Sequence, residues 1–231
     1  MKTGEALGVS QYDPSVLLGR SLNDIEKKFA PRLLYVAGPM RIPLPRPRVA
    51  LIGSREASAQ GVKDAESIVR ILVEKGAVIV SGLAKGIDTA AHKAAISRGG
   101  QTIAVIGTPL DRAYPAQNSL LQELMSREHL VISQFKVGTD VIRANFIQRN
   151  RTMALISDAS IIVQAGESSG SLSQGWETLR LGRPLFIWKS IFESSLRWPA
   201  NMVSYGAMKL SNPTDIIEHL PSTESILKIN V

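Results

Sequence analysis

The chain has 231 residues, of which 44% are hydrophobic and 20% charged, so it can bury the core of one large α/β domain or of two small ones. It contains no cysteine, which excludes disulfide bonds and thiolate metal sites. No apolar run approaches the roughly 18 residues of a membrane span and no signal peptide opens the sequence, so we expect a cytoplasmic protein that does not bind membranes.

The charge balance favours a polyanionic partner. The chain has 27 lysine and arginine residues against 20 acidic ones, a net charge of +7, and nucleic acid is the polyanion that such a balance favours above all. Residues 41–55 contain a group of arginines and no acid, and a second group consists of Arg143, Arg149 and Arg151. A solvated surface explains the first group equally well, so charge alone does not identify the partner.

Residues 1–47 precede the regular pattern of the chain. A short helix is expected at residues 21–29, and an edge strand at residues 33–36 lies in a proline-rich, extended stretch. The first part of this segment holds too few apolar side chains to cover themselves. We therefore predict an N-terminal arm and extended lead-in over residues 1–47, followed by one domain over residues 48–231 that includes a short C-terminal tail.

From residue 48 onward, short apolar runs alternate with segments of helical period. The runs predict strands at residues 49–52, 77–80, 102–106, 130–133, 160–163 and 184–188. The periodic segments predict helices at residues 65–73, 87–97, 120–125, 151–156 and 172–181. A long loop is expected over residues 134–150, and the tail suggests a loop at residues 199–206 and a short helix at residues 214–220.

Strands that are apolar throughout, each followed by a helix, predict a parallel sheet covered on both faces. The fold class is therefore α/β, with a Rossmann-like, doubly wound and mainly parallel sheet. In such folds ligands bind beyond the carboxyl ends of the strands, near the point where strand order reverses. The loops at residues 53–55, 82–88, 107–112 and 164–171 follow strands and are rich in Gly, Ser or Thr, so they are the candidate binding loops.

The second of these loops has the sequence S-G-L-A-K-G-I-D, residues 81–88. A strand that turns directly into a helix presents free backbone N–H groups and a positive dipole end, which favours an anion and most often a phosphate. Lys85 adds a positive charge beside this turn, whereas we expect Asp88 to hydrogen-bond to the N–H groups of its own loop.

Several common chemistries lack their signatures. The first strand is not followed by G-x-G-x-x-G, no acid follows the second strand, and no G-x-x-x-x-G-K-[ST] occurs, which argues against NAD-dependent enzymes and P-loop NTPases. The three histidines are scattered, and no G-x-S-x-G supports Ser-His-Asp catalysis. We predict no catalytic residue, no metal site and no cofactor.

The binding loops also carry a family resemblance. The motifs are V-A-L-I-G-S-R-E-A-S, V-S-G-L-A-K-G-I-D-T-A-A-H-K-A-A, I-A-V-I-G-T-P-L-D-R-A-Y-P, N-F-I-Q-R-N-R and E-S-S-G-S-L, in this order. Over residues 31–188 the chain resembles the DprA/Smf family of DNA-processing proteins. The resemblance implies a Rossmann-like fold, single-stranded DNA binding, a homodimer, and the loading of a RecA-type recombinase during transformation or recombination.

The resemblance also implies a site. In the family, the residues that correspond to Arg55 and Lys85 line a positive pocket for the DNA backbone, with the R-N-R and S-G-S segments at its rim. The expected DNA- or phosphate-binding residues are Gly53, Ser54, Arg55, Gly82, Lys85, Gly86, Gly107, Thr108, Arg149, Asn150, Arg151, Ser169, Gly170 and Ser171. Such a site needs cations and backbone donors aimed at phosphates, and its affinity should fall with salt.

Aromatic side chains for base stacking are few. Tyr114, Phe135 and Phe146 are the candidates near these loops, although core or dimer packing explains each of them more simply. Two positions depart from the family pattern: Ile147 replaces a proline, and Trp176 follows the S-G-S segment, where it could widen or close the pocket. The N-terminal helical and C-terminal winged-helix domains of many family members are not expected in this chain.

A second hypothesis uses the same loops for a small nucleotide, as a sensor or as a hydrolase like the LOG-type nucleotide phosphoribohydrolases of the wider superfamily. Those enzymes carry a glutamate three residues after a glycine-rich turn, and the matching residue here is Gln174. This difference argues against N-glycosidic hydrolysis and favours the DNA-binding hypothesis.

Overall fold

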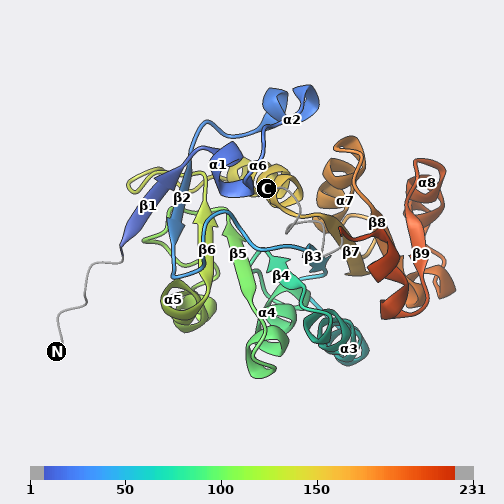
Figure 1. Ribbon diagram of the computed structural model, residues 1–231. Coiled ribbons are helices and arrows are strands. Elements are labelled where there is room, and N and C mark those ends of the chain that lie inside the picture. The colour runs from blue at the N-terminus through green and yellow to red at the C-terminus, as the bar shows by residue number, and fades with distance from the viewer. Residues whose placement is uncertain (1–7, 222–231) are drawn as a thin grey trace.

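In the computed structural model, which describes residues 8–221, nine strands form one sheet with the order β1-β2-β6-β5-β4-β3-β7-β8-β9 (Figure 1). The ends of the expected arm and domain, residues 1–7 and 222–231, lie outside the described residues. The strands are β1 (Val9–Tyr12), β2 (Leu34–Ala37), β3 (Arg48–Gly53), β4 (Val78–Ser81), β5 (Thr102–Ile106), β6 (Leu130–Ser133), β7 (Ala159–Gln164), β8 (Leu185–Trp188) and β9 (Met208–Leu210). All neighbours from β6 to β9 pair in parallel, whereas β1 and β2 extend the sheet antiparallel beyond β6.

Helices cover both faces of the sheet (Figure 1). The α-helices are α1 (Pro14–Leu18), α2 (Asp24–Phe29), α3 (Ala59–Glu74), α4 (Ile87–Ser97), α5 (Ser119–Glu128), α6 (Arg143–Ile156), α7 (Ser171–Arg180) and α8 (Trp198–Ser204). Short 3-10 helices are η1 (Ala116–Asn118), η2 (Lys189–Glu193) and η3 (Pro213–His219). The helices α3, α4 and α5 lie on one face, and α6 and α7 lie on the other. Within residues 8–221, none of the helices combines the length and the apolar character needed to cross a bilayer.

The two faces explain why the central strands are apolar throughout. In β3, Val49 and Leu51 pack with the apolar stripes of α3 and α4, while Ala50 and Ile52 pack with α6 on the opposite face. Side chains alternate between faces along a strand, so both sets must be apolar when both faces are covered. Burial of each large side chain contributes about 1.5 to 3 kcal/mol. The predicted α/β, doubly wound and mainly parallel fold is confirmed.

One element was predicted wrongly in the part of the chain that matters most for the site. Residues 134–150 were expected to form a loop, but α6 begins at Arg143 and runs to Ile156. The helix predicted at residues 151–156 is therefore only the second half of α6. In the first half the buried side chains include Asn145, Arg149 and Asn150, so no apolar period marks that half in the sequence. The loop expected at residues 199–206 is also wrong, because α8 begins at Trp198 and accommodates a proline in its first turn.

The N-terminal segment adds to the same sheet. The expected strand near residues 33–36 is β2, but it does not lie at the edge, because β1 pairs along its outer side. Leu17 of α1 and Leu34 of β2 are fully buried in the core that α6 and α7 also line. The apolar side chains of this segment are therefore covered by the sheet and its helices.

A buried carboxylate attaches α2 to the rest of the protein. Glu26 is 2% exposed and accepts hydrogen bonds from Arg20 at 2.6 and 2.7 Å, from Arg183 at 2.8 Å, and from the Asn23 N–H at 3.0 Å. Arg183 also donates to the carbonyl of Ala154 at 2.5 Å, near the end of α6. Burial alone would raise the pKa of Glu26, but the hydrogen bonds from Arg20, Asn23 and Arg183 outweigh it and lower the pKa to about 2.

We expect Glu26→Gln to destabilise the protein by about 3 kcal/mol, because it leaves a buried arginine partly unpaired. The wild type has a Glu26 pKa below the ordinary value of 4.5, so this stabilisation is present above about pH 4.5 and is lost as the pH falls toward 2. Urea unfolding between pH 7 and pH 3 measures both effects. The variant should lose less stability than the wild type over this range, and Glu66→Gln, on the exposed side of α3, serves as the control. An identical pH dependence in the wild type and Glu26→Gln would contradict this assignment.

Candidate functional site

A pocket lies where the strand order reverses. The chain progresses from β3 through β4 and β5 to β6, and α6 then crosses back so that β7 pairs with the other side of β3. The carboxyl ends of β3 and β7 therefore lie side by side, which is where ligands bind in this fold class. A cavity of about 940 Å³ opens there between the loop after β3, the start of α6 and the loop before α7.

Two backbone donors of the loop after β4 are bonded to a carboxylate of the protein itself. The carboxylate of Asp88 accepts hydrogen bonds from the N–H groups of Gly82 at 3.2 Å and Ala84 at 3.3 Å. The side-chain amide of Asn118 donates to the carbonyl of Leu83 at 2.9 Å, where the backbone has a positive φ of 56°. The expectation that Asp88 hydrogen-bonds to the N–H groups of its own loop is confirmed. These two N–H groups are therefore already bonded within the protein.

Arg149 forms the base of the pocket. Its guanidinium is buried and donates to the carbonyls of Gly82 at 2.5 Å and Val105 at 2.8 Å, and to the side-chain oxygen of Asn150 at 3.1 Å. A Cβ at position 82 would lie 2.0 Å from this guanidinium, so the close approach requires glycine. Burial lowers the pKa of Arg149 and raises that of Asp88, and the attraction between the two charges opposes both shifts.

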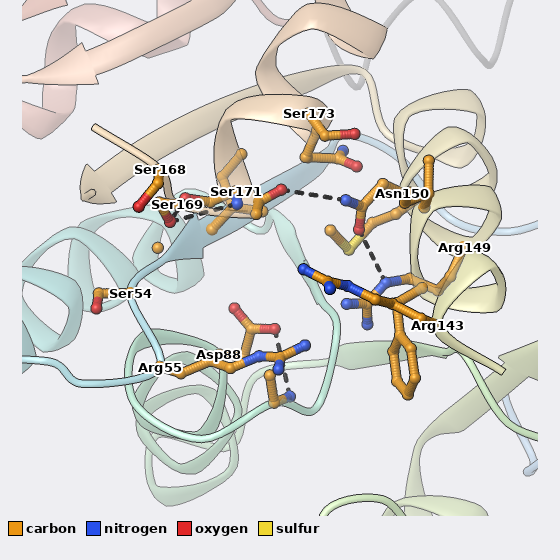
Figure 2. Close-up of a pocket in the computed structure, with 18 of the residues that line it drawn as sticks. Ser54, Arg55, Asp88, Arg143, Arg149, Asn150, Ser168, Ser169, Ser171 and Ser173 are labelled. Carbon is orange, nitrogen blue, oxygen red and sulfur yellow. Dashed lines mark hydrogen bonds between the residues drawn. The ribbon is translucent and has the colours of Figure 1, made fainter. Parts of the chain in front are cut away.

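Two helices begin at the pocket. The first residue of α6, Arg143, and the first residue of α7, Ser171, both line it, and neither helix start has a side-chain cap. The start of a helix carries a positive dipole end. Some of the first N–H groups are already bonded: that of Asn145 donates to the carbonyl of Ile142 at 3.0 Å, and that of Leu172 donates to the carbonyl of Ser169 at 3.1 Å. Figure 2 shows Arg55 and Arg143 extending toward the middle of the pocket from opposite sides, below the serines of the loop before α7. Two arginines and two helix starts therefore place positive charge at the pocket, beside the carboxylates of Glu56 and Asp88.

The structure brings together part of the expected binding set. The expected residues that line the pocket are Gly53, Ser54, Arg55, Arg149, Asn150, Ser169, Gly170 and Ser171. The expected residues that lie outside its lining are Gly82, Lys85, Gly86, Gly107, Thr108 and Arg151. Residues of the first group can contact a ligand in the pocket, whereas residues of the second group lie around the pocket.

The residues outside the lining have other contacts. Lys85 is exposed on the loop before α4, while Thr108 is buried and donates to the carbonyl of Arg112 at 2.7 Å. Arg151 lies on another side of α6, where it donates to Glu177 at 3.1 Å and faces the ring of Phe29.

Sequence reasoning missed some lining residues. Arg143, Ser168 and Ser173 line the pocket but were not among the expected site residues. Arg143 belongs to the arginine group that the sequence analysis noted around position 149. Because a loop was expected at this position, the sequence did not indicate that Arg143 begins a helix. Trp176 does not line the pocket and instead packs edge-on against Tyr205, with ring centroids 5.3 Å apart, so the expectation that it could widen or close the pocket is wrong.

The comparisons with known proteins agree with the motifs. The family model described as DNA recombination-mediator protein A matches residues 14–221. The chain is 41% identical over 189 residues to the DNA processing protein DprA of Streptococcus pneumoniae, which covers 81% of this chain and 66% of that protein. It is 33% identical over 192 residues to DprA of Bacillus subtilis, covering 83% and 65% respectively. The chain thus spans about two thirds of the length of these curated relatives.

Solved structures show the same likeness. The X-ray structure of DprA from Streptococcus pneumoniae has a TM-score of 0.78 and 33% identity, covering 93% of this chain and 75% of that one. A structure of DprA from Helicobacter pylori, described in terms of its single-stranded DNA binding mode, has a TM-score of 0.75 and 27% identity, covering 96% and 97%. A molybdenum cofactor binding protein from Rippkaea orientalis, with a TM-score of 0.54 and 18% identity over 80% of this chain and 99% of that one, shares the fold alone.

We expect Arg149→Met to destabilise the protein, because it leaves the buried carbonyls of Gly82 and Val105 without donors at a cost of about 1 to 3 kcal/mol each. Arg55→Met, at an exposed position of the same pocket, should leave stability nearly unchanged. Urea unfolding of the two variants at neutral pH measures the difference. Equal unfolding midpoints for both variants would show that Arg149 does not hold the strand ends together.

Proposed function

The chain belongs to the family of DNA recombination-mediator protein A, and we propose that it binds single-stranded DNA in the pocket at the ends of β3 and β7 and mediates recombination. The observation that carries this proposal is the convergence of two uncapped helix starts with Arg55 and Arg143 on one open cavity of about 940 Å³. A cavity of this size holds more than one phosphate, which fits a strand better than a single anion. The guanidinium groups and backbone donors of the lining bind phosphates without reading bases. The carboxylates of Glu56 and Asp88 also belong to the lining.

The proposed activity is binding, and no catalytic residue is part of it. Gln174 lines the pocket at the position where LOG-type enzymes carry a glutamate, and a neutral amide cannot act as a general acid or base. Among residues 8–221, no group of three or more histidine, aspartate or glutamate side chains is placed to hold a metal ion. Binding of a small nucleotide by the same residues would be an alternative result of the experiment below.

Two further parts of the proposal rest on family membership. As a recombination mediator, the chain would deliver bound single strands to a RecA-type recombinase in the cytoplasm during natural transformation or another recombination pathway. It would do so as a homodimer. Light scattering of the purified protein, with and without an oligonucleotide, would measure the mass in solution and test the dimer separately from DNA binding.

We expect a labelled single-stranded oligonucleotide of about twenty thymidines to bind more tightly than a duplex of equal length. Arg55→Ala and Arg143→Ala should each weaken binding by roughly tenfold, and each phosphate contact that is lost should reduce the salt slope by about 0.7. Lys85→Ala should have a smaller effect, because Lys85 lies outside the pocket lining. Fluorescence anisotropy at increasing salt concentrations measures all of these quantities.

The control is Arg70→Ala, which removes an exposed arginine of α3 that pairs with Glu74 at 3.5 Å and does not line the pocket. It should bind like the wild type. Salt-insensitive binding, or no preference for single strands, would overturn the proposed function. Saturable binding of a free nucleotide without any binding of the oligonucleotide would support the small-nucleotide alternative instead.

A further inference from the structure

A second group of cations lies outside the pocket, where α2 meets α6 and α7. Lys28 of α2, Arg151 of α6 and Arg180 of α7 gather around the ring of Phe29, and we call these three cations the Phe29 cluster. The Arg180 guanidinium lies 3.6 Å from the ring centroid, the Lys28 Nζ 5.5 Å and the Arg151 guanidinium 5.9 Å. Burial and the charge of Arg151 lower the pKa of Arg180, so the cations of the cluster repel one another.

The acids beside the cluster do not balance its charge. Glu177 accepts a hydrogen bond from the Nε of Arg151 at 3.1 Å and another from Arg180, so one carboxylate pairs with both arginines. Glu26 lines the same small cavity as Phe29, but it is already bonded to two other arginines. One carboxylate for three cations leaves an excess of two positive charges.

The arginines of the cluster also keep unused donors. A guanidinium carries five N–H donors. Among residues 8–221, Arg151 donates only through its Nε, and Arg180 donates only through its Nη2, in both cases to Glu177. The side chain of Arg151 is 42% exposed and that of Arg180 31%. An anion in solvent can therefore reach guanidinium donors that the protein leaves without partners in these residues.

The cluster lies directly beyond the pocket along two helices. On α6, Ile147 lines the pocket, and Arg151 follows it by four residues. On α7, Ser173 lines the pocket, and Glu177 follows it by four residues. Residues four apart lie on the same side of a helix, about 6 Å along its axis. Because α6 and α7 pack against each other (Figure 1), the seam between them leads from the pocket to the cluster.

We propose that the Fe-free Phe29 cluster is a second phosphate-binding site, which holds the single strand where it leaves the pocket along the seam between α6 and α7. This inference rests on the proposed function and adds the path of the strand outside the pocket. A strand carries a charge at every nucleotide, so a strand that fills the pocket brings further phosphates to the next cations along its path. Arg151 and Arg180 supply fixed donors, and Lys28 supplies a charge on a flexible stem.

The test compares thymidine strands of about six and about twenty nucleotides, because only the longer strand can occupy the pocket and the cluster together. Arg151→Gln should weaken binding of the long strand by roughly tenfold, reduce its salt slope by about 0.7 and leave the short strand unchanged. Lys28→Glu, at an exposed position that does not endanger folding, should have a similar effect. The matched control is Lys93→Glu, an equal charge reversal at an exposed position of α4, on the other face of the sheet.

A second measurement uses the wild-type protein. Acetylation of lysine side chains, read by mass spectrometry, should show that the long strand protects Lys28 and the short strand does not, while Lys93 reacts equally in both complexes. Equal binding of the long strand by Lys28→Glu and Lys93→Glu, or an equal loss for both lengths in Arg151→Gln, would overturn the second site while leaving DNA binding in the pocket intact. Failure of the wild type to bind either strand would overturn the proposed function itself, so the two failures are distinguishable.

Discussion

The buried guanidinium of Arg149 is the interaction on which the pocket depends. It extends from α6, the helix that carries the chain back across the sheet, and donates to the carbonyls of Gly82 and Val105 at the ends of β4 and β5. A buried guanidinium is stable only when its donors are hydrogen-bonded and a negative charge lies near. Asp88 provides that charge, and its carboxylate also binds the loop after β4. The hydrogen bonds of Arg149 and Asp88 thus connect α6, two strand ends and the start of α4.

This arrangement divides the site into a fixed base and an accessible rim. Because the carboxylate of Asp88 accepts hydrogen bonds from the N–H groups of Gly82 and Ala84, the loop after β4 is held in a fixed conformation. The charges that a ligand can reach come instead from the exposed residues Arg55 and Arg143 and from two helix starts. A base of fixed geometry lowers the entropy lost on binding, and long side chains at the rim can follow a backbone whose phosphates vary in position.

The sequence predicted the fold well because apolar runs mark every strand from β3 to β8. It predicted the place of the site, since ligands in such sheets bind where strand order reverses. It predicted only the second half of α6, because the buried side of the first half is polar: Asn145 and Asn150 fill positions that an amphipathic helix would give to apolar residues. The absence of a side chain at Gly107 makes room for the ring of Phe146. The sequence alone cannot distinguish such a glycine from one that lets a ligand approach the backbone.

The charges at the two ends of α6 connect the N-terminal segment to the pocket. At its last turn, Arg183 donates to the carbonyl of Ala154 and to that of Ser157, so a cation lies at the negative end of the helix dipole. Glu26 of α2 holds that cation in place through a bond of 2.8 Å. At the other end, the first turn of α6 faces the pocket without a cap, where an anion would complete the same pattern. The N-terminal segment therefore supports the far end of the helix whose near end lines the pocket.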